Sequence, residues 1–191
     1  MTTALTRQPA PSLRDYEVTH GIRTIIHFQL AFQQHEWYCQ TLKEIGMEVE
    51  VLPPQENFPD SVFIEDNAII LDELAIITPM GTASRQGEPT LLLSVLSRYR
   101  HLVNISLPAM IEGGDVIVIG KTLYVGISSR SNQAGIEALR MIGKTFGYQV
   151  VPIPIHGCLH LKTACTPLDD ETLLVNPAWI DLEALKTFRL L

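Results

Sequence analysis

A chain of 191 residues, 46% of them hydrophobic, is long enough to bury one core or two small ones. Its net charge of −7 argues against nucleic acid as the main partner, because phosphate binding needs a basic surface. Three cysteines are too few for a disulfide framework and suit a reducing compartment. The sequence shows no secretory-signal pattern and no apolar run of the roughly 20 residues that span a bilayer. These features predict a cytoplasmic protein that binds neither nucleic acid nor membranes.

Hydrophobic periodicity predicts helices that alternate with pairs of short strands. A helix over 31–45 carries apolar side chains at three- and four-residue spacing and stops at a glycine. Another helix, over 131–147, has Ser131 or Asn132 as its N-cap and Gly147 at its end. The other expected elements are strands over 47–52 and 148–155, hairpins over 67–78, 110–130 and 162–176, and helices over 88–99 and 181–188.

The three hairpins belong to a repeat of about 48 residues. Glu65 opens the first hairpin, Glu112 the second and His160 the third. Each repeat reads as strand, strand, helix, strand, and a period of this length is typical of radial or solenoid architectures. In a radial arrangement equivalent strand starts converge on one axis. The three ionisable side chains are therefore expected to face a common centre, where they form a candidate site.

Two carboxylates and an imidazole at one centre suit a planar cation. A guanidinium presents up to five N–H donors in a fixed fork, and carboxylates accept them in pairs. A histidine beside them can move protons. Breaking a guanidine C–N bond also needs a nucleophile at the central carbon, usually a thiolate. This chemistry does not by itself exclude a simple cation-binding site.

Five segments of the chain carry a resemblance to a known family. They are "FPDSVFIEDNAII", "SRQGE", "IEGGD", "LYVGISSRSNQAGIE" and "CLHLKTACT", in this order along the chain. Together they resemble dimethylarginine dimethylaminohydrolase, of the guanidine-modifying (pentein) superfamily. The resemblance implies an α/β fold, an α/β-propeller of strand-strand-helix-strand repeats with pseudo-five-fold symmetry. About four of the five blades are expected here, as a single domain over 1–191 that is truncated at its C-terminus.

The resemblance also implies roles for individual residues. Glu112 and His160 are expected to be catalytic, Glu112 by holding the guanidinium and His160 as general acid/base. Asp66 matches a second carboxylate on the guanidinium. Arg85 and Arg130 match groups that bind the substrate's α-carboxylate, a task suited to a guanidinium fork. The remaining residues expected to line the substrate site are Asp60, Glu65 and, in a lid loop, Val18. Neither a metal ion nor an organic cofactor is implied.

One position separates the related enzymes. Arginine deiminases resemble this pattern but read "HLDT" where this chain reads "HLKT", with Lys162. The added Asp of deiminases binds free guanidino nitrogens. A dimethylated nitrogen has no N–H to offer, so a carboxylate facing it would be unpaired. The sequence therefore favours methylated arginine over arginine as the small-molecule substrate.

The family's nucleophilic Cys lies in the repeat expected to be absent. Cys158, two residues before His160, is a poor substitute, because relatives often carry it without using it as the nucleophile. The expectation is a hydrolase of methylated arginine by family, inactive in this truncated chain. Two alternatives stay open: a non-catalytic protein that binds arginine-like ligands, and an arginine deiminase-like hydrolase. A homodimer formed through the gap left by the absent blade is a further expectation.

Overall fold

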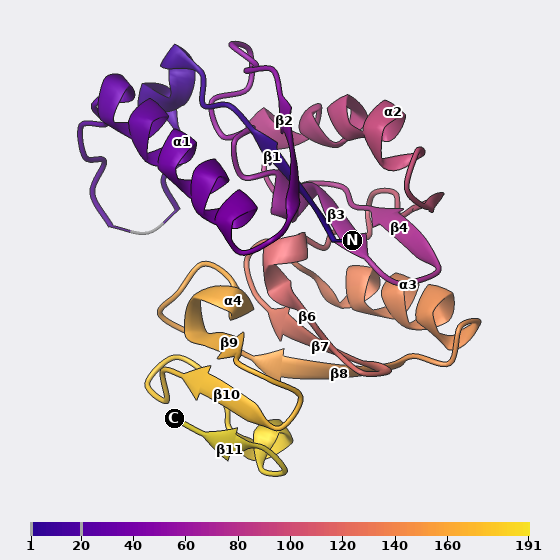
Figure 1. The fold of residues 1–191 in the computed structure, drawn as a ribbon. Coiled ribbons are helices and arrows are strands. Elements are labelled where there is room, and N and C mark those ends of the chain that lie inside the picture. Colours follow the sequence, from indigo (N-terminus) through magenta and orange to yellow (C-terminus); the bar gives the residue numbers. More distant parts are fainter. Residues whose placement is uncertain (1, 20) are drawn as a thin grey trace. The chain divides into compact units, whose positions relative to one another are not determined.

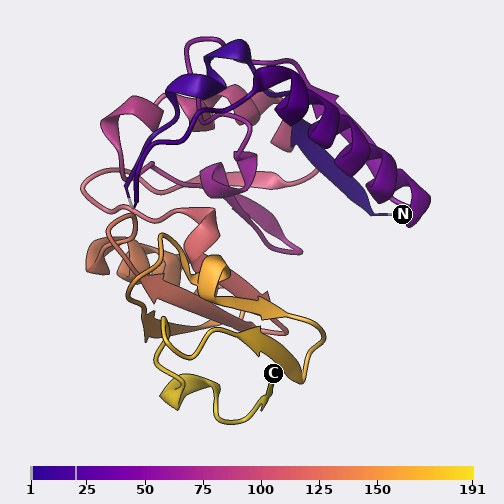
Figure 2. The same ribbon diagram turned by 90° about the vertical axis from the view of Figure 1, so that its left-hand side faces the viewer.

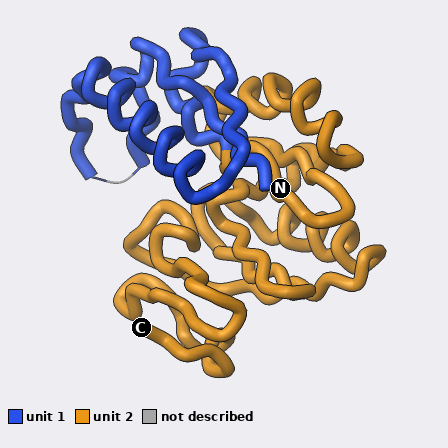
Figure 3. The backbone as a smooth tube through the Cα atoms, in the orientation of Figure 1, with its two compact units in different colours: residues 1–64 blue, residues 65–191 orange. Residues whose placement is uncertain are grey.

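The computed structural model describes residues 2–19 and 21–191. It divides into two compact units, residues 1–64 and residues 65–191 (Figure 3). The single domain over 1–191 stays a prediction, and each unit is described by itself below.

Unit 1 is a strand–helix–strand element. Strands β1 (Thr3–Arg7) and β2 (Glu48–Leu52) pair in parallel, and helix α1 (Phe28–Glu44) connects them (Figure 1). A 3-10 turn, η1 (Pro11–Asp15), follows β1. Helix α1 starts three residues before the predicted helix and ends just ahead of a glycine with φ of 90°. A parallel pair needs such a crossover, because its strands run in the same direction.

Unit 2 contains three three-stranded sheets with the same order of strands (Figure 1). In each sheet the first two strands pair antiparallel, and the third lies parallel to the second. The strands are β3 (Ala68–Ile70), β4 (Leu74–Ile77) and β5 (His101–Asn104); β6 (Val116–Ile119), β7 (Thr122–Ile127) and β8 (Gln149–Pro154); and β9 (Cys165–Pro167), β10 (Thr172–Val175) and β11 (Arg189–Leu190). The predicted strand order of the repeat is thus present three times in this unit.

The helices of unit 2 differ more from the prediction. Helix α3 (Gln133–Lys144) follows an N-cap, Asn132, whose side chain accepts from Gly135 N at 2.8 Å. The predicted helix over 88–99 is instead a 3-10 turn, η4 (Glu88–Leu92), and one α-turn, α2 (Leu93–Leu96). The prediction over 181–188 was wrong, because only the turn η6 (Glu183–Leu185) forms and β11 then completes the third sheet. The remaining short elements are η2 (Ile64–Asn67), η3 (Ala83–Arg85), η5 (Gly113–Asp115) and α4 (Leu161–Ala164).

The middle sheet, β6–β8, is buried on both faces. Alternate residues of a strand point to opposite faces. Val116 therefore packs with Ile136 of α3 and with the sheet β3–β5, whereas Ile117 packs with Leu173 and the sheet β9–β11. Figure 2 shows the sheets β6–β8 and β9–β11 lying one beside the other. This packing sets the starts of the three sheets in fixed relation to one another.

Among the described residues, no helix combines the length and the apolar character that crossing a membrane requires.

Candidate active site

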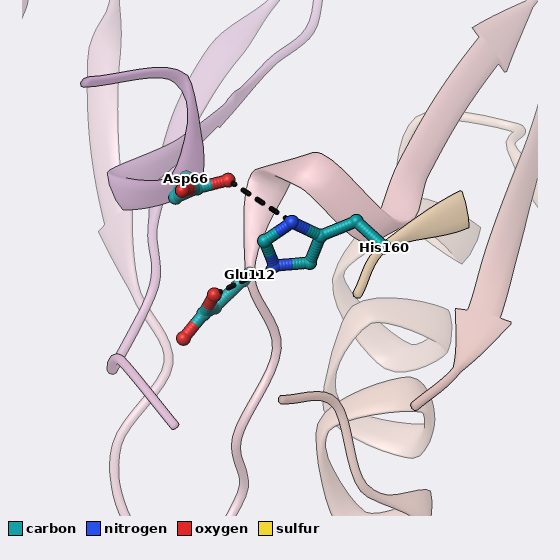
Figure 4. A group of neighbouring side chains, drawn as sticks. All are labelled: Asp66, Glu112 and His160. Carbon is teal, nitrogen blue, oxygen red and sulfur yellow. Dashed lines mark hydrogen bonds and ion pairs between the residues drawn. The ribbon is translucent and has the colours of Figure 1, made fainter. Parts of the chain in front are cut away.

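Three buried ionisable side chains meet where the three sheets of unit 2 begin. Asp66 lies in η2 before β3, Glu112 stands directly before η5 and β6, and His160 stands directly before α4 and β9. Each contributes one N or O atom to a cluster in which all atoms lie within 4.8 Å of one another (Figure 4). The convergence predicted from the repeat is therefore seen for Glu112 and His160, with Asp66 as the third member.

The imidazole of His160 lies between the two carboxylates (Figure 4). Its Nε2 is 2.8 Å from Glu112 Oε2, and its Nδ1 is 3.9 Å from Asp66 Oδ1. All three residues are buried, with Glu112 at 0% exposure. An anion beside each ring nitrogen favours the doubly protonated imidazolium, which has an N–H for both.

Glu112 is held by donors on both of its oxygens. While Oε2 faces His160, Oε1 accepts the backbone N–H of Gly81 at 2.8 Å and lies 3.4 Å from Arg130 Nη1. Arg130 follows β7, is 3% exposed and also reaches Thr82 Oγ1 at 3.4 Å. Glu112 thus orients the imidazole that it contacts, and it is tied to one of the two arginines expected at the substrate carboxylate.

The other arginine, Arg85, is bound on two sides by carboxylates. Its Nη1 donates to Asp66 Oδ2 at 2.9 Å, while Nε and Nη2 donate to the two oxygens of Glu88 at 3.0 and 2.9 Å. Burial disfavours the charge of Arg85, but the two carboxylates outweigh burial and raise its pKa. Glu88, at 2% exposure, was missed as a site residue in the sequence. The spacing of three residues within "SRQGE" is the signal that could have found it.

Glu65 points away from this cluster. Its side chain is 60% exposed and pairs with Lys162 at 3.5 Å. Both residues line a separate cavity of about 690 Å³, whose walls come mainly from the first strands β3, β6 and β9. The repeat placed Glu65 at the common centre, whereas the structure puts its neighbour Asp66 there.

Asp60 and Val18 lie in unit 1. Asp60 is 7% exposed, and its Oδ2 accepts the backbone N–H of Glu17 at 2.9 Å. Val18 is the next residue along the chain and is half-buried. Within this unit, Asp60 is therefore bonded to the residue directly before Val18.

The glycine pair after Glu112 is required by close packing. A Cβ at Gly114 would lie 2.6 Å from Asp66 Oδ1 and 2.8 Å from His160 Nδ1. A Cβ at Gly113 would lie 2.0 Å from the carbonyl oxygen of Glu65. Any side chain at either position would push these groups apart, so the backbone itself forms the floor beneath the cluster.

The same three residues could in principle offer ligands to a metal ion. In the observed arrangement, however, Nδ1 of His160 faces Asp66 and Nε2 faces Glu112. A metal bound through either nitrogen would have to displace the carboxylate contact on that side. The geometry therefore suits a protonated imidazole between two carboxylates better than a bound metal ion.

The cysteines lie outside this cluster in the part of the chain that the structure describes. Cys158 Sγ contacts the backbone carbonyl of His160 at 3.5 Å, and burial and the charge of Asp115 raise its pKa. Cys165 is buried, which raises its pKa to about 11. Cys39 belongs to α1 of unit 1. Both thiols of unit 2 are thus held in the protonated form, which is a weak nucleophile.

Known proteins are similar to this chain in sequence and in fold. The family model described as "N,N dimethylarginine dimethylhydrolase, eukaryotic" matches residues 14–166. The N(G),N(G)-dimethylarginine dimethylaminohydrolase of Streptomyces coelicolor is 37% identical over 183 residues, which cover 95% of this chain and 71% of the relative.

The chain belongs to the dimethylarginine dimethylaminohydrolase family.

A second member of the dimethylarginine dimethylaminohydrolase family, from Pseudomonas aeruginosa, is 30% identical over 189 residues, covering 98% of this chain and 74% of the relative. A structure of a Cys-to-Ser mutant of the P. aeruginosa enzyme in complex with citrulline has a TM-score of 0.94 and 29% identity. That match covers 100% of this chain and 75% of the other. The mixed α/β fold is therefore the fold of this hydrolase family.

The charges of His160 and Glu112 are expected to make folding stability depend on pH. Burial disfavours the charge of His160, but its bond to Glu112 and the charges of Asp66 and Asp115 raise its pKa above 6.5. Burial also penalises the charge of Glu112, but His160, the N–H of Gly81 and the charge of Arg130 lower its pKa below 4.5. A raised histidine pKa contributes stability that is present below pH 6.5 and lost as pH rises through the folded-state pKa.

The lowered pKa of Glu112 affects stability at acidic pH. It contributes stability that is present above pH 4.5 and lost as pH falls through the folded-state pKa of Glu112. Urea unfolding at a series of pH values should show both losses, and His160→Gln should flatten the alkaline one. His101→Gln, at an exposed site in β5, is the control. An alkaline slope that is equal in wild type and His160→Gln would contradict the assignment.

Proposed function

We propose that this chain binds Nω-methylated arginine at the Asp66–Glu112–His160 cluster and takes part in its hydrolysis to citrulline and dimethylamine. The excess of buried negative charge around His160 carries this proposal. The unit that holds the cluster is taken to be part of an α/β-propeller with about four blades in this chain, as the repeat predicts.

The buried charges of the site do not balance by themselves. Four carboxylates lie within it: Asp66, Glu88, Glu112 and Asp115. Asp66, Glu88 and Glu112 pair with the guanidinium groups of Arg85 and Arg130 and with the imidazole of His160. Asp115 is instead bonded by two hydroxyl groups and one backbone N–H. With every carboxylate ionised and His160 protonated, one negative charge is left over. Methylated arginine carries one net positive charge, so its entry would neutralise the site.

The proposed reaction assigns a proton transfer to His160. A thiolate adds to the central guanidinium carbon, and the C–N bond to the dimethylated nitrogen breaks. The imidazolium of His160 gives its proton to the departing amine, which leaves as dimethylamine. The imidazole then takes a proton from water, whose oxygen replaces sulfur at the carbon and yields citrulline. Asp66 and Glu112 stabilise the positive charge that stays on the guanidinium and on His160.

Two observations favour particular forms of this function. Lys162, where deiminases have an acid, is turned to Glu65, which supports a substrate without free N–H groups at that end. Burial keeps the thiols of Cys158 and Cys165 protonated. The second candidate is therefore binding of the same ligand without turnover, because these thiols are poor nucleophiles.

Calorimetry with Nω,Nω-dimethyl-L-arginine and L-arginine tests the binding, and a citrulline assay tests turnover. Asp66→Asn should weaken dimethylarginine binding about 10-fold, because a buried anion facing the cation is lost. Asp72→Asn removes the same charge from an exposed turn between β3 and β4 and should bind like wild type. Equal affinities of Asp66→Asn and wild type would sink the proposal. Citrulline release that persists in Cys158→Ser would show that this thiol is not the nucleophile.

A further inference from the structure

Asp115 is a buried carboxylate to which the proposed reaction assigns no step. It ends η5, three residues after Glu112, and its exposure is 0%. A buried charge is costly unless it is paired or hydrogen-bonded. Its hydrogen-bond donors are two hydroxyl groups and one backbone N–H, all of them neutral.

The two hydroxyl groups come from the loop that carries Arg130. Ser128 Oγ donates to Asp115 at 2.5 Å and accepts the backbone N–H groups of Arg130 at 2.9 Å and Ser131 at 3.2 Å. Ser131 Oγ donates to the same carboxylate at 2.6 Å and accepts the backbone N–H of Glu112 at 3.1 Å. Through these two serines, the carboxylate fixes the loop on either side of Arg130. It also links this loop to the backbone of Glu112.

The third donor belongs to the segment that carries His160. Asp115 Oδ1 accepts the backbone N–H of Leu161 at 3.0 Å, and Leu161 directly follows His160. A glycine leaves room for this contact, because a Cβ at Gly126 would lie 2.8 Å from Asp115 Oδ1 and 3.0 Å from Leu161 Cβ. One side chain therefore links three chain segments, each of which carries a residue of the cluster or its arginine.

We propose that Asp115 is a positioning residue, whose carboxylate holds Arg130 and His160 in their places beside Glu112. The ligand-binding part of this role rests on the proposed function, whereas the geometric part concerns the free protein alone.

The donor pattern requires a carboxylate rather than a polar side chain of the same shape. Ser128 uses its one hydrogen for Asp115 and both lone pairs for backbone N–H groups. An amide nitrogen at position 115 would be a donor facing an oxygen whose acceptor sites are already taken. Asp115→Asn therefore keeps the volume but puts a donor in place of one of the two acceptor oxygens, so it opposes either the two serine hydroxyls or the N–H of Leu161.

The charge of Asp115 carries a cost in the folded state. Burial raises the pKa of Asp115, although Ser128, Ser131, the charge of His160 and the N–H of Leu161 act in the opposite direction. A raised carboxyl pKa means that folding stability is lost as pH rises through the folded-state value. Since burial makes this charge costly, we explain the carboxylate by the three chain segments that its hydrogen bonds hold together.

The test uses the complete 191-residue chain with Asp115→Asn and Ser128→Ala. Proton NMR reports the Nε2–H of His160 that bonds Glu112, and calorimetry reports binding of Nω,Nω-dimethyl-L-arginine. In Asp115→Asn the bonded N–H signal should shift upfield or vanish, and affinity should fall about 10-fold. The pKa of His160 should also fall, because Asp66 and Glu112 are then the two anions that still face it. Asp72→Asn is the matched control and should change none of these quantities.

Ser128→Ala separates the two parts of the role. It should leave the His160 signal unchanged, speed amide hydrogen exchange at Arg130 and weaken ligand binding about 5-fold. A wild-type His160 signal in folded Asp115→Asn, or wild-type exchange at Arg130 in Ser128→Ala, would overturn the proposal. If Asp115→Asn fails to fold, exchange at Arg130 in Ser128→Ala decides. If wild type binds no methylated arginine, the proposed function fails, while the NMR and exchange results still decide the role of Asp115.

Discussion

Glu112→Gln is expected to lower the pKa of His160 and to weaken binding of Nω,Nω-dimethyl-L-arginine by about 30-fold or more. Glu112 is 0% exposed and bonds the imidazole at 2.8 Å, so it is the nearest anion that stabilises the imidazolium. A neutral amide donates to Nε2 and thereby favours the uncharged ring. NMR titration of His160 and calorimetry measure the two effects on the same samples.

Glu137→Gln is the control for this change. Glu137 pairs with Arg140 on the surface of α3, and its side chain is 50% exposed. Its loss should leave both the titration of His160 and the affinity unchanged, since exposed ion pairs contribute little. A Glu112→Gln variant that titrates and binds like wild type would show that this carboxylate does not orient the imidazole.

Glu88→Gln is expected to lower the free energy of unfolding by about 3 kcal/mol. Glu88 binds Arg85 through two oxygens, and both side chains are at most 5% exposed. Removing one partner leaves the buried guanidinium with Asp66 as the anion that it contacts. Guanidinium chloride unfolding followed by circular dichroism measures this loss.

The chain offers a matched control for the buried pair. Glu183 and Lys186 have the same three-residue spacing, but their side chains are 72% and 65% exposed. Glu183→Gln should cost less than about 0.5 kcal/mol, because water already screens this pair. If Glu88→Gln costs no more than Glu183→Gln, then burial does not set the strength of the Arg85–Glu88 pair.

Much of unit 2 follows from local sequence pattern. Paired runs of apolar residues around polar turns predicted the antiparallel hairpins, and the helix that α3 forms was predicted with Ser131 or Asn132 as its N-cap, of which Asn132 is observed. Alternation along β6 also fixes which side chains enter which core, as Val116 and Ile117 show. The short helices were less predictable. The segment over 181–188 has a helical pattern but forms one 3-10 turn before β11, because pairing with β10 takes up the residues that follow.

Some residues of the candidate site could also be predicted from the sequence, and others could not. Residue type and the period of about 48 residues indicated that Glu112 and His160 would meet, since equivalent positions of a repeat occupy equivalent places. The choice between Glu65 and Asp66 could not be made in this way. The two are neighbours in a 3-10 turn, whose residues point about 120° apart, so only one of them can face the cluster.

The sequence by itself determined the order of strands in the repeat, the family of the chain and the residue types that gather at the strand starts. These depend on short-range patterns, which the chain carries whether or not it is folded. Only the tertiary structure decided that Asp66 binds Arg85, that Asp115 links the loops of Arg130 and His160, and that Gly114 must lack a side chain. Those features depend on distances of a few ångströms between segments that are far apart along the chain or in separate turns, and packing alone sets such distances.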